Sequence, residues 1–130
     1  MSDKEKLEAG VQLYFDSLYE SSEEKVRAIF PDAAMVSGYL PDGLHEMNLD
    51  EFAGFVASQQ PSPKESGAEV LLEIVSCDID GSTAAVQVRD GYLGMVFLDK
   101  LSFLKVDGEW KIYQKGILKI LLPKLATLFH

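Results

Sequence analysis

The chain has 130 residues, 47% of them hydrophobic and 25% charged, and its formal net charge is −9. This length allows one domain, because two separate cores would be too small to stand alone. The composition is that of a globular protein and excludes a disordered or fibrous chain. A strongly acidic surface repels polyanions, so we expect neither nucleic acid nor an anionic membrane as the main partner.

The sequence favours a reducing compartment. Cys77 is the only cysteine, so an intramolecular disulfide is impossible. The opening MSDKEKLEAG is charged and lacks the apolar centre of a signal peptide. No window approaches the roughly 20 apolar residues of a membrane span. We therefore expect a cytoplasmic protein.

Two helices are predicted at the start of the chain. Ser2 and Glu5 form the pattern of a capping box, and Ser21 with Glu24 repeats the signal. Pro31 ends the second helix. The apolar stripe of the first helix consists of Leu7, Val11, Tyr14, Phe15 and Leu18.

A β-hairpin and a third helix follow. AMVSGYL is a short β-prone run, and Asp42-Gly43 offers a turn into LHEM. Asn48 and Glu51 cap the third helix, whose apolar side carries Phe52. QQPSPKESG then reads as a loop within the domain.

Four strand-like runs occupy the rest of the chain: EVLLEIVSCDI, TAAVQVRD, GMVFLDKLSFLKV and EWKIYQKGI. The predicted hairpin turns between them are Asp80-Gly81, Asp90-Gly91 and Asp107-Gly108. The run over 94–106 exceeds the usual strand length of about 5–6 residues, which indicates a long bent strand. The order α-α-β-β-α-β-β-β-β predicts an α+β fold with helices on one face of a curved antiparallel sheet, which leaves a cone-shaped hollow.

The segments VQLYFDSLYESSEEKVRAIFPDA, DEFAGFVAS and FLDKLSFLKVDGEWKIYQKG resemble the putative lumazine-binding branch of the nuclear-transport-factor-2-like (NTF2-like) superfamily, with its SnoaL-like and ketosteroid-isomerase-like members. The resemblance covers roughly residues 7–117. It implies a cone-shaped NTF2-like (cystatin-like) domain over 1–117, followed by an extension over 118–130. Isomerases, dehydratases, cyclases and transport factors share this fold, so the fold does not select a function.

Comparison with ketosteroid isomerases within this superfamily implies roles for two residues. Tyr14 corresponds to their first-helix tyrosine and Asp99 to their neutral strand acid, which together hydrogen-bond a developing enolate. The position of their catalytic base corresponds to Gly38, flanked by Ser37 and Tyr39. Because this base is missing, ketosteroid isomerisation does not follow.

Asp99 is the strongest candidate for chemistry. Strict alternation places it on one strand face with Phe97, Leu101 and Phe103. A carboxyl group among these side chains would be desolvated, which raises its pKa and lets the neutral acid donate a hydrogen bond. The alternative is a structural acid that pairs with Lys115 or lies in a dimer contact.

The remaining candidates complete a predicted site. Tyr14 would face the ligand or be an ordinary core tyrosine. Histidine is a common acid–base catalyst, which makes His45 a candidate, but a histidine in an exposed hairpin is more commonly only solvated. Tyr92 and Tyr113 are possible rim groups. The predicted ligand-binding residues are Tyr14, Tyr39, Phe55, Phe97, Asp99, Leu101 and Phe103, with Asp99 and His45 as catalytic candidates.

The sequence predicts neither a metal site nor a cofactor. SCDIDG superficially matches a calcium loop, but its twelfth position is Gln87, which cannot supply a bidentate carboxylate. Cys77 and the two histidines show no zinc-ligand spacing.

The tail ILKILLPKLATLFH is dense in apolar residues that must be covered. It could close the mouth of the cone, extend a dimer interface or lie on a membrane surface. We expect a short C-terminal helix packed on its own domain or on a partner subunit.

Three functions remain open on this basis. The favoured one is a pocket for a flat, mostly apolar ligand with one polar end near Tyr14 and Asp99. The alternatives are an isomerase, dehydratase or cyclase that uses Asp99 or His45, and a non-catalytic interaction or dimerisation module. A homodimer formed through the sheet face is expected in each case, because the face away from the helices needs cover.

Overall fold

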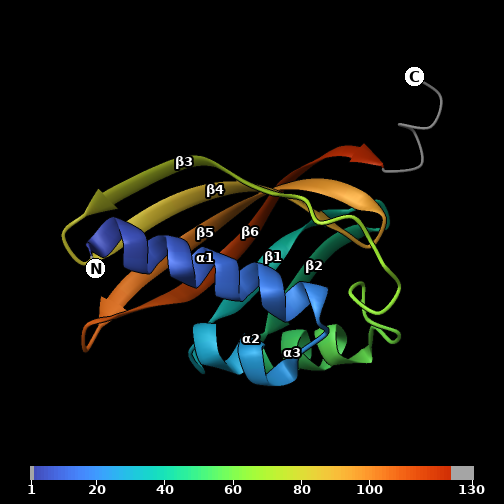
Figure 1. Cartoon of the computed structure of the whole chain (residues 1–130), viewed down its shortest axis with the longest axis horizontal. Coiled ribbons are helices and arrows are strands. Elements are labelled where there is room, and N and C mark those ends of the chain that lie inside the picture. The colour runs from blue at the N-terminus through green and yellow to red at the C-terminus, as the bar shows by residue number, and fades with distance from the viewer. Residues whose placement is uncertain (1, 124–130) are drawn as a thin grey trace.

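The computed structural model describes residues 2–123. Three helices lie on one side of a curved six-stranded sheet, as the α+β prediction requires (Figure 1). The elements are α1 (Asp3–Tyr19), α2 (Glu23–Ile29), β1 (Met35–Leu40), β2 (Gly43–Asn48), α3 (Leu49–Ser58), β3 (Leu72–Asp80), β4 (Thr83–Tyr92), β5 (Met95–Val106) and β6 (Glu109–Pro123).

The strands follow the spatial order β2-β1-β6-β5-β4-β3. All neighbouring pairs are antiparallel except β1 and β6, which pair in parallel from Met35–Gln114 to Gly38–Ile117. The parallel pair is absent from the sequence prediction. It arises because α3 and the following loop carry the chain to the far edge of the sheet, where β3 lies. The strands β3, β4, β5 and β6 then follow one another back across the sheet, so that β6 lies next to β1.

Side chains cap the helices. Ser2 and Glu5 form a reciprocal capping box at α1, and Asn48 and Glu51 form another at α3, as predicted. At α2 the N-cap is Ser22, whose hydroxyl accepts a hydrogen bond from the amide of Lys25, and not the predicted Ser21. Ser21 instead has a positive φ of 49° in the turn between the two helices.

One predicted turn is wrong, and its correction matters for the site. β4 continues through the expected Asp90-Gly91 turn, and the chain reverses at Leu93-Gly94. Both turn residues have positive φ, 54° and 74°, as a tight hairpin turn requires. Asp90 therefore pairs with Phe97 inside the sheet.

The sheet is strongly curved, as expected. β5 has 12 residues and β6 has 15, and their pairing shifts register at three places. Such irregularities bend a strand and increase its twist. In Figure 1 the long strands curl over α1, while α2 and α3 lie beside the β1–β2 hairpin.

The C-terminal segment differs from the expected helix over the residues that the structure describes. Residues 118–123 continue β6 and pair with the start of β5, from Leu98–Lys119 to Met95–Pro123. The reason is that residues 95–98 of β5 extend beyond the end of β1. Their backbone N–H and C=O groups are available to pair with residues 119–123 as a strand. Residues 124–130 lie outside the described part of the chain.

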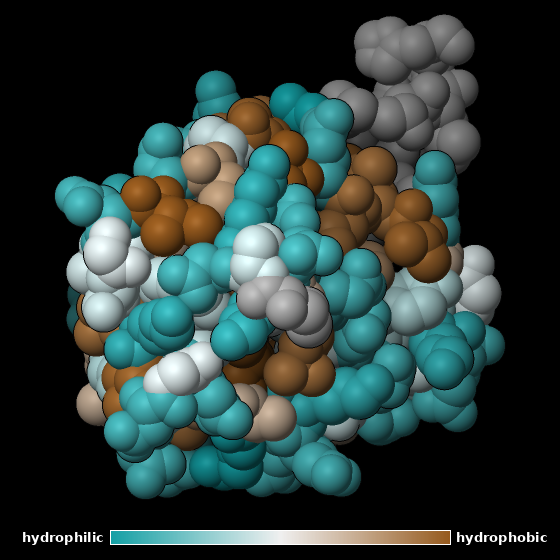
Figure 2. Space-filling model, turned by 60° about the vertical axis from the view of Figure 1, so that its left-hand side comes forward, coloured by the Kyte–Doolittle hydropathy of each residue, from teal (hydrophilic) through white to brown (hydrophobic). Residues whose placement is uncertain are grey.

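The core fills the space between the helices and the inner face of the sheet. The stripe of α1 is buried, including Leu7, Tyr14 and Leu18, against alternate residues such as Val86 and Leu101. On the side shown in Figure 2, apolar residues form small groups separated by hydrophilic ones. None of the helices within residues 2–123 has the length and apolar character needed to cross a membrane.

Candidate functional site

A cavity of about 200 Å³ lies on the helix side of the sheet. It is enclosed by the β1–β2 hairpin, α3, the β4–β5 turn and the middle of β6. Most of its wall is hydrocarbon. The apolar side chains in this wall include Val36, Leu40, Met47, Phe52, Phe97 and Ile117.

Three buried ionisable residues also line this cavity: Asp90, Asp99 and Lys115. They come from the adjacent strands β4, β5 and β6. Alternation along β4 and β5 turns Asp90 and Asp99 to the helix side, together with core residues such as Val88 and Leu101. In β6 a register shift between Ile112 and Gln114 interrupts the alternation, so that Lys115, three residues after the buried Ile112, is buried as well. The two carboxyl residues are each 1% exposed and Lys115 is 5% exposed, so solvent hydrates none of the three fully.

The hydroxyl of Tyr14 joins the two carboxyl groups from behind. It lies 2.9 Å from Asp90 Oδ2 and 3.2 Å from Asp99 Oδ2. Tyr14 is fully buried on the sheet side of α1 and is not among the residues that line the cavity. The tyrosine therefore holds the carboxyl pair in place from the core.

Hydrogen-bonding capacity remains unused at this cluster. Asp90 Oδ1 and Asp99 Oδ1 are buried and make no hydrogen bond to any described residue. Lys115 Nζ lies 5.2 Å from the ring centroids of both Tyr14 and Phe52 and forms no ion pair or hydrogen bond within the described chain. Contact with two aromatic faces stabilises the ammonium group in this low-dielectric setting.

Burial raises the pKa of the Asp90 carboxyl well above its ordinary value, and the neighbouring charge of Asp99 adds to this effect. The charge of Lys115 and the hydrogen bond with Tyr14 act in the opposite direction. The pKa of Tyr14 is also raised, mainly by burial and then by the charges of the two aspartates. Burial and the neighbouring carboxyl charges therefore favour the protonated forms of Asp90 and Tyr14.

The structure brings together only part of the predicted site. Asp99, Phe55, Phe97 and His45 line the cavity. His45 is also tied to the hairpin turn, because its Nε2 lies 2.7 Å from Asp42 Oδ1.

The other predicted residues lie elsewhere. Tyr39 is 68% exposed, whereas Leu101 and Phe103 are packed in the core away from this cavity. Any role of these three in ligand binding stays a prediction.

Asp90 was missed because Asp-Gly is a strong turn signal. The available clue was the alternation of Ala84, Val86 and Val88, which places residue 90 on the same buried face. Lys115 was considered only as a partner of Asp99, yet it forms no ion pair with it.

Packing closes position 38, which the resemblance to ketosteroid isomerases predicts as the place of their catalytic base. Gly38 has a φ of +155°, and a Cβ atom there would lie 2.5 Å from Cβ of Ile117. The parallel pairing of β1 with β6 creates this close approach. A side chain at position 38 therefore has no room.

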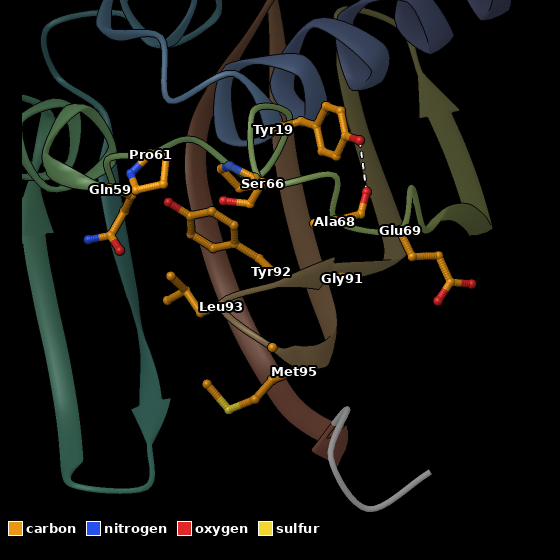
Figure 3. Close-up of a pocket in the computed structure, with 12 residues that line it drawn as sticks. Tyr19, Gln59, Pro61, Ser66, Ala68, Glu69, Gly91, Tyr92, Leu93 and Met95 are labelled. Carbon is orange, nitrogen blue, oxygen red and sulfur yellow. Dashed lines mark hydrogen bonds between the residues drawn. The ribbon is translucent and has the colours of Figure 1, made fainter. Parts of the chain in front are cut away.

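A second cavity, of about 240 Å³, lies beside the first and shares Tyr92 and Leu93 with it. Figure 3 shows Tyr92 projecting towards the loop that carries Pro61 and Ser66, while Tyr19 donates a hydrogen bond to the carbonyl oxygen of Ala68. The Tyr92 hydroxyl is buried and has no hydrogen-bond partner among the described residues. Tyr92 thus forms the partition between the two cavities.

Solved structures confirm the fold. An NTF-2 like protein of unknown function from Silicibacter pomeroyi DSS-3 superposes with a TM-score of 0.82, at 24% identity, over 92% of this chain and 99% of that chain. NTF2-like proteins of unknown function from Methylobacillus flagellatus KT (TM-score 0.76, 24% identity, 88% and 89% covered) and Shewanella baltica OS155 (0.72, 23%, 89% and 94%) are also similar. At these identities the likeness establishes the fold and not the function.

Comparison with curated proteins gave no match. The family model described as "Putative lumazine-binding" matches residues 2–116, which is most of the chain. That match spans all three helices and the strands that carry Asp90, Asp99 and Lys115. The chain therefore belongs to the putative lumazine-binding family, and its fold is that of NTF2-like proteins.

Proposed function

We propose that the protein binds a small, mostly apolar molecule in the cavity lined by Asp90, Asp99 and Lys115. The observation that carries this proposal is a pair of buried carboxyl groups, each with an unpartnered oxygen, in the wall of a hydrocarbon cavity. A buried acceptor without a partner costs about 1–3 kcal/mol. A polar ligand group that reached these oxygens would remove this cost.

The cavity volume limits the ligand. Drug-sized ligands occupy pockets of roughly 300–1,000 Å³, and this cavity measures about 200 Å³. A ligand of one or two rings suits this volume, whereas a four-ring steroid does not. The aromatic side chains of Phe52, Phe55 and Phe97 favour a flat ring system.

The geometry supports binding more than enolate chemistry. The single proton of the Tyr14 hydroxyl is engaged with the carboxyl pair, so this group does not donate to a ligand. Position 38 has no space for the base that ketosteroid isomerases place there. These two features favour ligand binding over ketosteroid isomerisation.

A thermal-shift screen tests the proposal. The panel contains one- and two-ring heterocycles and phenols, lumazine among them, and four-ring steroids for comparison. A ligand at about 100 times its dissociation constant raises the free energy of unfolding by roughly 2.7 kcal/mol. We expect stabilisation by some of the small compounds and none by the steroids.

A matched pair of variants locates the binding site. Leu40→Trp fills the cavity, because Leu40 lies in its wall, whereas Leu104→Trp adds the same side chain on an exposed strand position outside it. Binding should be lost only in Leu40→Trp. The proposal would be overturned if none of the small compounds stabilised the wild type, or if both variants bound a ligand equally well.

A homodimer formed through the outer sheet face is proposed as the assembly. A cross-strand row of Asp78, Ala85, Ser102, Gln114 and Met35 runs across this face with small or short side chains at its middle. Short side chains allow two sheets to approach closely. Sedimentation should give a dimer for the wild type and a monomer for Ala85→Arg; a monomeric wild type at micromolar concentration would contradict the assembly.

A further inference from the structure

Two carboxyl groups share the Tyr14 hydroxyl. It has one proton to donate, and Tyr14 Oη lies within hydrogen-bond distance of two carboxyl oxygens, Asp90 Oδ2 and Asp99 Oδ2. That proton is therefore used within the cluster and does not reach a ligand.

Burial raises the pKa of the Asp90 carboxyl well above its ordinary value, which favours its protonated form. The Tyr14 hydroxyl contacts Oδ2 of both carboxyl groups. The remaining oxygens, Asp90 Oδ1 and Asp99 Oδ1, have no partner among the described residues and are left as acceptors.

Lys115 presents the opposite kind of group. Its ammonium group has three N–H donors and no acceptor among the described residues, because its two close contacts are the aromatic rings of Tyr14 and Phe52. Lys115, Asp90 and Asp99 line the same cavity. The wall of this cavity thus contains both hydrogen-bond donors and hydrogen-bond acceptors.

The wall of the cavity disfavours a charged ligand. Most of this wall is hydrocarbon, and burial of a ligand's net charge against hydrocarbon is costly. The cavity therefore favours an uncharged ligand.

We infer that the ligand is an uncharged ring compound whose polar end both donates and accepts hydrogen bonds, as the adjacent N–H and C=O of a cyclic amide do. The N–H donates to the free oxygen of Asp99 or Asp90, and the C=O accepts from Lys115. This inference rests on the proposed function and deepens it by naming the chemical class. Carboxylic acids, amines and plain hydrocarbons of the same size are disfavoured.

A matched ligand series tests the class by isothermal titration calorimetry. The probes are 2-quinolone, N-methyl-2-quinolone, naphthalene and 2-naphthoic acid, which share a two-ring frame. 2-Quinolone should bind most tightly. Methylation removes the donor and leaves a buried carboxylate oxygen unpaired, so binding should weaken roughly tenfold or more. Naphthalene and the naphthoate anion should be weaker than 2-quinolone by at least the same factor.

Variants assign the contacts. Asp99→Asn changes a pure acceptor to a group that also donates, and Lys115→Met removes the donors while it keeps the stem. Each should reduce the preference for 2-quinolone over naphthalene at least about tenfold. Asp78→Asn and Lys105→Met are the controls, since Asp78 is exposed on β3 and Lys105 lies over Trp110 away from the cavity; both should keep the preference.

The outcomes separate the two proposals. If naphthalene or the N-methyl compound binds as tightly as 2-quinolone, the cavity binds ligands but the inferred class is wrong. If the preference exists but survives in both Asp99→Asn and Lys115→Met, the assignment to this cluster is wrong. If none of the four probes binds, and the thermal-shift panel is silent as well, the proposed function fails together with the inference.

Discussion

The Tyr14 hydroxyl lies 2.9 Å from Asp90 Oδ2, although 76 residues separate the two in the chain. The contact joins α1 to β4 at a point where no solvent reaches either group. Asp99 on β5 lies 3.2 Å from the same hydroxyl, so one tyrosine connects a helix to two strands.

Removal of the Tyr14 hydroxyl should destabilise the fold. Tyr14→Phe leaves Oδ2 of both aspartates without a partner, and we expect the free energy of unfolding to fall by about 1–3 kcal/mol. Urea denaturation measures this change. Tyr19→Phe, which loses one hydrogen bond to the carbonyl oxygen of Ala68, is the control and should cost less, about 1 kcal/mol. A Tyr14→Phe protein as stable as the wild type would contradict the cluster.

Stability should depend on pH through Asp90, which faces Asp99, Lys115 and Tyr14. The folded state holds the Asp90 proton above the ordinary pKa of 3.8, whereas the unfolded chain releases it there. Because the folded state binds more protons in this window, the free energy of unfolding falls as pH rises from about 4 towards the raised pKa.

Asp90→Asn should remove this pH dependence, since asparagine does not titrate. The difference in unfolding free energy between wild type and Asp90→Asn should shift in favour of the variant by up to about 1.4 kcal/mol per pH unit. Urea denaturation at pH 4, 5, 6 and 7 provides the test. If the free energies of unfolding of the two proteins changed with pH in parallel, the pKa of Asp90 in the folded state would be close to its ordinary value.

Position 38 should reject any side chain. Gly38→Ala places a Cβ atom 2.5 Å from Cβ of Ile117 in a backbone conformation that favours glycine, and we expect a loss of at least about 2 kcal/mol. Gly43→Ala is the matched control, because Gly43 has a φ of +128° but no atom within 4 Å of the added Cβ. Gly43→Ala should therefore lose less stability than Gly38→Ala. If the two variants unfolded at the same temperature, the sheet would have to relax around position 38.

Tyr92→Phe should leave stability unchanged or raise it by up to about 1 kcal/mol. The variant removes a buried hydroxyl that has no partner among the described residues, and thus removes a desolvation cost. Thermal unfolding of Tyr92→Phe beside Tyr14→Phe makes the comparison. A loss in Tyr92→Phe as large as that in Tyr14→Phe would mean that the Tyr92 hydroxyl does form a strong hydrogen bond.

Local patterns determined much of this protein. Capping boxes at Ser2 and Asn48 are complete within four residues of chain, so the sequence alone predicts where α1 and α3 begin. Alternation also placed Asp99 on the buried face of β5, because side-chain direction in a strand depends only on the count of residues. The overall α+β architecture followed from the order of such elements.

Only the tertiary structure decided the composition of the site. Asp-Gly at 90–91 is a good turn locally, but pairing of Gly91 with Val96 extends the strand and buries Asp90. The parallel contact of β1 with β6, which closes position 38 against Ile117, joins segments that carry no mutual signal in the sequence. Proton sharing among Tyr14, Asp90 and Asp99 depends on distances across three elements, and such distances are set by packing rather than by residue type.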